Sequence, residues 1–250
     1  MRLRFAHDIR ELALGAGADF FGVADLAPAH DAILEQGGES VAHFPRAVAI
    51  GIALPHSIID LLPERTSVAV ARKYRQLYTE TNQHLDEITS RLVGRLQHAG
   101  SSALAVPASH SADPDRLCGV FSHKLAAHLA GLGWIGKSCL LITLEAGPRV
   151  RWATVLTDAP LAATGQAADE QCGACRQCVD TCPARAFTDR PFRVAEHRDM
   201  RFAAKKCKSY VTEMKEKMGC PVLCGLCVSV CPHGRQRHPQ NQGFYEEIRP

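Results

Sequence analysis

The 250-residue sequence predicts two folded parts, a layered α/β or α+β domain over residues 1–163 and a cysteine-rich module over residues 164–235. Short apolar runs alternate with amphipathic segments in the first part, which is typical of a sheet covered by helices. A polar linker begins at Thr164, and beyond it lie nine of the eleven cysteines. A polar tail is expected over residues 236–250.

Three apolar runs in the first domain have the length and the boundaries of β-strands. Each is short and ends at turn residues or at a proline, as buried strands do. They cover residues 19–25, 46–54 and 103–107. An amphipathic pattern over residues 4–16 predicts a helix before the first of them.

A long helix is predicted between the second and third strands. Leucines and an isoleucine recur at helical spacing over residues 82–97, and Gly100 supplies a stop. Tyr74, Tyr78 and Asn82 lie on one side of the same helix at spacings of four. Packing against the sheet accounts for these three side chains better than a ligand contact does.

A further helix is expected over residues 120–130, followed by a hairpin of two strands at residues 140–144 and 150–157. Arg149 and Arg151 alternate on the second strand of this hairpin. They either lie on an exposed strand face or pair with an anionic group of a cofactor.

The first cysteine run has the spacing of bacterial ferredoxins, Cys172-x2-Cys175-x2-Cys178-x3-Cys182-Pro183. In that pattern three closely spaced thiolates bind one [4Fe–4S] cluster, and the cysteine before the proline binds another. Structural zinc usually takes two separated cysteine pairs, and one zinc ion cannot use this many thiolates. The sequence therefore predicts two [4Fe–4S] clusters.

The crossed arrangement of ligands assigns the first cluster to Cys172, Cys175, Cys178 and Cys231. The second cluster then takes Cys182, Cys224, Cys227 and one further cysteine. Cys220 is one residue too far from Cys224 for a symmetric ferredoxin, and Cys207 is the competing candidate. Crossed ligation holds two clusters close together, so the module is predicted to relay electrons.

Composition and the N-terminal sequence limit the other possibilities. A net charge of +3 gives no strong footprint for nucleic acid, although residues 198–217 are locally basic. The first dozen residues contain charges and no apolar signal segment, so disulfides are not expected and the cytoplasm is the predicted location. The longest apolar stretch, residues 47–54, is too short to cross a bilayer, so no membrane partner is expected.

The segment Ala130-Gly-Leu-Gly-Trp-Ile-Gly-Lys137 is rich in glycine. It lacks the spacing of a Walker phosphate loop, and it follows a predicted helix and precedes a strand, which is the reverse of a dinucleotide fingerprint. Glycines let the backbone approach a bound group closely. The predicted cofactor contacts are Gly131, Gly133, Trp134, Gly136 and Lys137.

The sequence AGLGWIGKSCLLI, followed by VRWATVLTDAPL and the cysteine module, resembles epoxyqueuosine reductase and its relatives, which include the reductive dehalogenases. The resemblance implies a nitroreductase-like α/β domain that carries a cobalamin, followed by a ferredoxin-like module with two [4Fe–4S] clusters. Lys206-Cys207-Lys-Ser-Tyr210 is similar to the segment that supplies a cluster ligand in the family. This similarity favours Cys207 over Cys220.

The activity that the resemblance implies is electron transfer from a donor such as ferredoxin or flavodoxin, through the clusters, to a cobalamin-type cofactor. That cofactor would reduce an electrophilic small molecule or modified nucleoside. The chain ends nineteen residues after Cys231, without the helical repeats that help the family to hold tRNA, which disfavours tRNA as a partner.

Alignment to the glycine segment puts Leu117 where the family has its presumed proton-donating aspartate. The nearby candidates for the acid are Asp113, Asp115 and His123. Lys124 is most simply a solvated helix residue, and Cys118 and Cys139 are expected to pack in the core. A second function stays open: an electron-transfer or reductive-activation partner with two clusters, no corrinoid and no chemistry of its own.

Overall fold

The computed structural model describes residues 2–235, so the expected tail lies outside the described residues. One antiparallel sheet of four strands forms the centre of the first domain, in the order β1-β2-β6-β3. Its strands are β1 (Phe20–Asp25), β2 (Arg46–Ala53), β3 (Ala103–Val106) and β6 (Val150–Thr157). The four predicted strand positions are therefore correct, and the antiparallel pairing makes the fold α+β in character.

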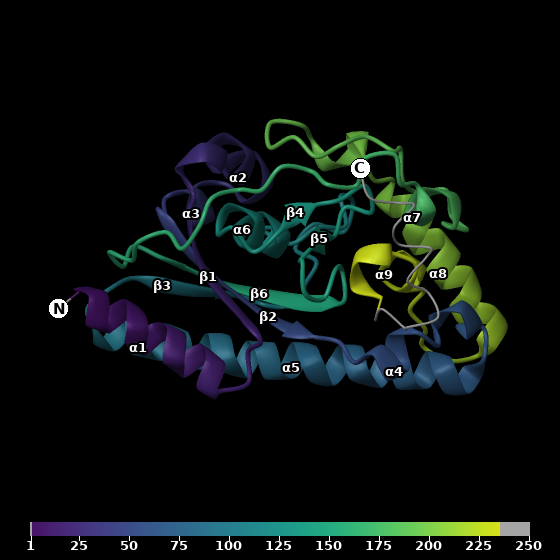
Figure 1. Cartoon of the computed structure of the whole chain (residues 1–250), viewed down its shortest axis with the longest axis horizontal. Helices are drawn as coiled ribbons and strands as arrows, with labels where there is room; N and C mark the ends of the chain where they lie inside the picture. Colours follow the sequence, from purple (N-terminus) through teal and green to yellow (C-terminus); the bar gives the residue numbers. More distant parts are fainter. Residues whose placement is uncertain (1, 236–250) are drawn as a thin grey trace.

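Helices cover both faces of this sheet (Figure 1). On one face α1 (Arg2–Gly15) and α5 (Val68–His98) pack against Val48 and Ile50 of β2. On the other face α6 (His123–Leu129) packs against Ala47 and Ala49. Successive side chains of a strand point to opposite faces, which is why this one strand contributes to both cores. The remaining short helices on the first domain are η1 (Ala27–Ala29), α2 (His30–Gly37), α3 (Glu39–Ala42), α4 (His56–Ile59) and η2 (Leu62–Glu64).

Helix α5 is about twice as long as the apolar pattern predicted, with 31 residues. Its second half follows the sheet, whereas its first half extends beyond the sheet and packs against the cysteine module. There Ala71 contacts Met214 and Val222, and Tyr74 packs in a cluster with Val228. The sequence pattern missed this half because it is covered by a separate module rather than by the sheet.

The expected hairpin between residues 140–144 and 150–157 is wrong. β5 (Leu141–Ile142) pairs instead with β4 (Trp134–Ile135), while β6 pairs with β2 and β3. The physical reason is burial: Trp134 and Ile142 form a small core with Cys231, which draws this segment toward the cysteine module. Helix α6 is also shorter than expected and is capped by Ser122, whose hydroxyl accepts a hydrogen bond from the Leu125 amide.

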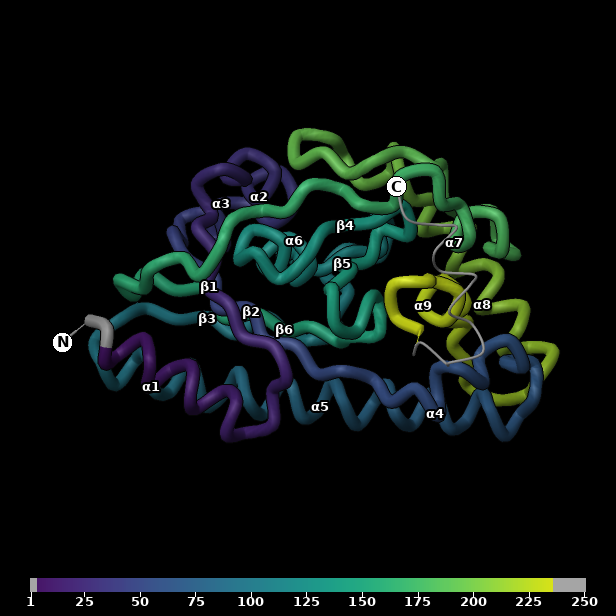
Figure 2. Tube along the Cα trace, in the orientation of Figure 1, coloured from purple at the N-terminus to yellow at the C-terminus, as the bar shows by residue number. Residues whose placement is uncertain are grey.

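The cysteine module wraps around one end of the first domain, and the linker that leads into it runs back across α6 (Figure 2). Thr164 anchors this linker, because its hydroxyl accepts from the Val23 amide at 3.0 Å. The module contains α7 (Gln177–Asp180), η3 (Arg198–Met200), α8 (Ala204–Met218), α9 (Leu226–Ser229) and η4 (Pro232–Gly234). Among the described helices, none combines the length and the apolar character that a bilayer crossing requires.

Candidate functional site

The structure brings four cysteines of the module together as a first thiol group: Cys172, Cys175, Cys178 and Cys231. Burial raises the pKa of Cys231 to about 12, and the neighbouring Cys172, Cys178 and Cys175 add to the rise. Three members come from the first cysteine run and one from the end of the second. This grouping is compatible with the crossed arrangement, and the assignment of cluster ligands stays a prediction.

A second thiol group contains Cys182, Cys207, Cys224 and Cys227. Burial raises the pKa of Cys207 to about 11, with further contributions from Cys224 and Cys182. Burial also raises the pKa of Cys227, and Cys224, Cys207, Cys178 and Cys182 contribute. Cys220 instead packs against the apolar cluster of Met214 and Val222. The placement therefore supports Cys207 as the fourth member of this group.

Eight thiols in two groups are a suitable donor set for two [4Fe–4S] clusters. A buried thiol ionises when a metal ion binds it, so metal binding would offset the raised pKa values. Within residues 2–235, no three His, Cys, Asp or Glu side chains are arranged as a site for a single metal ion.

The glycine segment lies against the first thiol group. A β-carbon added to Gly136 would be 3.0 Å from the Cys172 sulfur, and Trp134 packs with Cys172 and Cys231. Lys137 Nζ donates to the Gly173 carbonyl at 2.7 Å. Gly133 has a φ of 153°, and an added β-carbon would meet the Ile142 carbonyl at 2.1 Å. Gly131 approaches the linker backbone at residues 165–166. None of these five predicted cofactor contacts lines the cavity described next, and three of them, Trp134, Gly136 and Lys137, lie beside the first thiol group.

A cavity of about 640 Å³ lies between the first domain and the module. Its walls come from the loop that joins β3 to α6, from residues 150–152 of β6 and from residues 192–201 of the module. The apolar wall includes Phe121, Trp152 and Phe192. The lining also carries the cations Lys124, Arg116, Arg151, Arg198 and Arg201, against the acids Asp31, Glu35 and Glu196.

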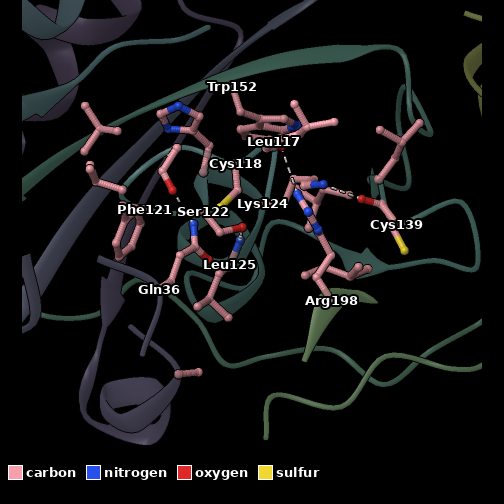
Figure 3. A pocket seen from close by; sticks show the side chains of 18 of the residues that line it. Gln36, Leu117, Cys118, Phe121, Ser122, Lys124, Leu125, Cys139, Trp152 and Arg198 are labelled. Carbon is pink, nitrogen blue, oxygen red and sulfur yellow. Dashed lines mark hydrogen bonds between the residues drawn. The ribbon is translucent and has the colours of Figure 1, made fainter. Parts of the chain in front are cut away.

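Lys124 and Arg198 fix two sides of this cavity (Figure 3). Lys124 Nζ donates to the Cys139 carbonyl at 2.6 Å, and burial lowers the pKa of this lysine. Arg198 donates to the carbonyls of Arg116 and Leu117, the latter at 3.0 Å. The module is therefore tied to the loop that forms the opposite rim. Lys124 therefore lines the cavity, whereas it was expected to lie on a solvated helix face.

The two aspartates predicted as acids point elsewhere. Asp113 Oδ1 accepts from the amides of Asp115 and Arg116, each at 2.8 Å, so its carboxylate closes a turn. The Arg116 amide bond, followed by the bond from Asp115, lowers the pKa of Asp113. Neither Asp113 nor Asp115 lines the cavity. This geometry disfavours both as proton donors there.

His123 lines the cavity, but both of its ring nitrogens are used internally. Nε2 is 3.1 Å from the Pro107 carbonyl and Nδ1 is 2.9 Å from the Thr154 hydroxyl. Burial lowers the pKa of His123 to about 4. The ring is therefore neutral near pH 7, with Nε2–H donating to the carbonyl and Nδ1 accepting from the hydroxyl, which argues against His123 as the acid.

The cavity contains a tyrosine whose chemistry the sequence did not reveal. The Arg151 guanidinium lies 4.1 Å from the centre of the Tyr78 ring, and the Tyr78 hydroxyl is 2.7 Å from Ser109 Oγ. Burial alone would raise the pKa of Tyr78, but Arg151 and hydrogen bonds to Ser109, Asn82 and Arg151 outweigh burial and lower it. By contrast, burial raises the pKa of Tyr74 on the same helix. The spacing of four residues between Tyr74, Tyr78 and Asn82 could have indicated a ligand contact, but it was interpreted as packing against the sheet.

The two cysteines expected in the core both line the cavity. Cys139 is buried and Cys118 is half-buried. Arg149 is almost fully buried rather than exposed, and its guanidinium pairs with Asp60 at 2.7 Å and contacts His56 Nδ1 at the same distance. It connects the start of β6 to α4.

Comparison with known proteins identifies the cysteine module. Residues 171–234 match the family described as the 4Fe-4S double cluster binding domain. The epoxyqueuosine reductase of Pseudomonas aeruginosa is 34% identical over 133 residues, which cover 49% of this chain and 34% of that protein. That of Lactococcus garvieae is 28% identical over 212 residues, covering 81% and 55%. The chain resembles the epoxyqueuosine reductases.

Solved structures support the fold of this epoxyqueuosine reductase-like chain. An epoxyqueuosine reductase bound to an epoxyqueuosine-modified tRNA-Tyr stem loop matches with a TM-score of 0.61 at 20% identity, covering 96% of this chain and 69% of that one. The catabolic reductive dehalogenase NpRdhA in complex with 3-bromo-4-hydroxybenzoic acid matches with a TM-score of 0.68 at 20% identity, covering 95% and 33%. The chain spans about a third of the length of the Pseudomonas aeruginosa reductase and about half of that of the Lactococcus garvieae reductase.

Proposed function

We propose that this protein is an iron-sulfur reductase in which two [4Fe–4S] clusters pass electrons to a cobalamin-type cofactor in the cavity. The observation that carries the proposal is the position of the thiol groups beside that cavity. Leu140, on the cavity wall, packs in the same apolar cluster as Cys227 of the second thiol group. Electrons held by the module would therefore enter the cavity over a short distance.

The proposed division of labour follows the two parts of the chain. Residues 1–163 would form a nitroreductase-like layered domain that holds cofactor and substrate, and residues 164–235 would hold the clusters. The first thiol group would bind one cluster and the second group, including Cys207, the other. The glycine segment would bring its backbone close to the first cluster, since Gly136 leaves room beside Cys172.

The cavity has features that suit a bound organic cofactor. Its volume falls within the range of about 300–1,000 Å³ that is typical of sites for drug-sized ligands, so a corrinoid would fill it and extend beyond its mouth. Trp152 lines it, and the Trp152 Nε1 is buried with no hydrogen-bond partner within residues 2–235, so a bound acceptor could satisfy it. Cobalamin would supply reducing power at its metal toward an electrophilic carbon. The apolar walls would exclude water from the reaction.

Tyr78 is the proton donor that this geometry supports best. Its hydroxyl faces Ser109 in the cavity, and Arg151 stabilises the phenolate that would remain after proton transfer. The substrate would be an electrophilic small molecule or a modified nucleoside. Two relatives point in this direction: one is bound to an epoxyqueuosine-modified tRNA stem loop, and another is described in terms of B12-dependent dehalogenation.

The proposal is tested by protein prepared without oxygen and supplied with cobalamin, followed by assays of iron, sulfide and cobalt per chain. We expect about eight irons and one cobalt, as two cubanes and one corrinoid require. Iron without cobalt would favour the second candidate, an electron-transfer or reductive-activation partner. That alternative is supported by Leu117, which stands where the family has its presumed acid. A preparation that contains zinc instead of iron would overturn both.

A further inference from the structure

The first turn of α8 concentrates positive charge around a predicted cluster ligand. Lys205, Lys206 and Lys208 are exposed there and together span the solvent side of the helix, whereas Cys207, between them in the sequence, lies on the half-buried side. We call these three lysines the α8 basic face. The other half of the helix alternates in sign, with Glu213, Lys215, Glu216 and Lys217. The charge is therefore confined to the end of the helix that carries the cysteine.

This distribution works against the stability of the helix. The N-terminus of a helix carries a partial positive charge, so anionic side chains stabilise the first turn and cationic ones destabilise it. The first turn of α8 has no acidic residue. None of the three lysines forms an ion pair with any other residue in the range 2–235. Residues that lower the stability of the helix in which they lie are typical of functional positions.

The α8 basic face is well placed to receive electrons. Figure 1 shows α8 at the outer edge of the module, with α9 between it and the centre of the molecule. Cys207 lies within electrostatic range of Cys224 and Cys182. In the same thiol group, Cys227 on α9 packs in one apolar cluster with Leu140 of the cavity wall. One thiol group thus connects the basic face to the cavity.

We propose that the α8 basic face is the docking site of an acidic one-electron carrier protein, a flavodoxin in its hydroquinone form. Complementary charge on two partners accelerates their encounter and orients them. The anionic flavin hydroquinone would lose one electron and become the neutral semiquinone, with no proton released. The oxidised [4Fe–4S]²⁺ cluster of the second group would gain that electron and become [4Fe–4S]⁺. This inference rests on the proposed function, because it requires that cluster.

The test compares two matched pairs of lysines on the same helix in iron-loaded protein. Lys206→Gln/Lys208→Gln removes two charges of the basic face, and Lys215→Gln/Lys217→Gln removes two charges with the same spacing from the other end. Cluster reduction by a flavodoxin of strongly negative net charge is followed by anaerobic stopped-flow absorbance. Ionic strength is varied between about 0.01 and 0.1 M, over which the Debye length falls from about 30 to about 10 Å.

For the unmodified protein we expect a rate constant that falls steeply with salt. Lys206→Gln/Lys208→Gln should lower this constant about tenfold at low salt and flatten the salt dependence, because steering by charge is lost. Lys215→Gln/Lys217→Gln should behave like the unmodified protein. Lys206→Arg/Lys208→Arg, which keeps the charge, should also retain the rate, and calorimetric titration with oxidised flavodoxin should show the same order of affinities.

A different role for the lysines would be to balance the negative charge of the cluster itself. In that case the Gln pair would shift the midpoint potential and would slow reduction by dithionite as well, with an unchanged salt dependence. That result would overturn the docking proposal, and so would equal effects of the two Gln pairs. If the Gln pair at 206 and 208 loses iron, Lys205→Gln and Lys215→Gln provide a matched comparison with one charge removed from each end of the helix. Unmodified protein that holds no iron would refute the proposed function and the docking site with it.

Discussion

The choice between Cys207 and Cys220 is decided by two single substitutions. Each thiol group offers four sulfurs, so Cys207→Ala leaves three protein ligands for the second cluster. We expect iron to fall from about eight to about four atoms per chain, because one cubane of four irons is no longer held. Cys220→Ala should keep all the iron and should lower the free energy of unfolding by only about 1 kcal/mol, since it removes one sulfur from the contact with Met214 and Val222.

The assay is reconstitution without oxygen, followed by iron and sulfide determination and by electron paramagnetic resonance of the dithionite-reduced protein. Two adjacent reduced clusters interact magnetically, so the unmodified protein and Cys220→Ala should give the broadened spectrum of a coupled pair. Cys207→Ala should give the simpler spectrum of one isolated cluster. Full iron content in Cys207→Ala together with a half-loss in Cys220→Ala would refute the assignment.

Three further predictions concern the first domain. Gly133→Ala should destabilise the protein by several kcal/mol in denaturant unfolding, roughly the cost of overpacking plus backbone strain, because the new carbon would meet the Ile142 carbonyl. Gly94→Ala, on the open face of α5, should instead stabilise the protein by about 0.5–1 kcal/mol in the same measurement. In carbon-13 NMR of ring-labelled tyrosine, the phenol of Tyr78 should titrate at lower pH than that of Tyr74, and Arg151→Met should raise the pKa of Tyr78. An unchanged titration of Tyr78 in Arg151→Met would contradict the pairing of Tyr78 with Arg151. The pKa of His123 is about 4 in the folded protein and about 6.5 when unfolded, so the unfolded chain binds the proton more readily and stability falls as the pH drops through this window. His123→Gln should remove roughly 2 kcal/mol of the loss between about pH 7 and about pH 5, and equal losses in both proteins would argue against the buried neutral ring.

Local patterns were enough to predict the strands of the central sheet. Residues 20–25, 46–53 and 150–157 are apolar runs with clear boundaries, and their burial in the sheet follows directly. The pairing of Leu141–Ile142 was not predictable in this way. Its partner, Trp134–Ile135, is chosen by contacts with Cys231, about ninety residues further along the chain.

Some features of the candidate site could likewise be predicted from local sequence, and others depend on the fold. Cysteine spacing reflects a chemical requirement of the cluster, so it predicted both thiol groups before any fold was known. The acid could not be found by proximity in sequence, since Asp113 turns away to close its own loop. Tyr78 and Arg151 meet only because α5 and β6 are packed together, and neither residue has a motif of its own.

Residues 192–201 belong to the cysteine module, yet they form part of the wall around the cavity. If the module holds the proposed clusters, their loss to air would therefore loosen the enclosure in which a small molecule would bind, so iron content and ligand affinity would be lost together. Ligand screens on aerobically purified protein would then be negative because the cavity wall is disrupted, and not because of the specificity of the protein.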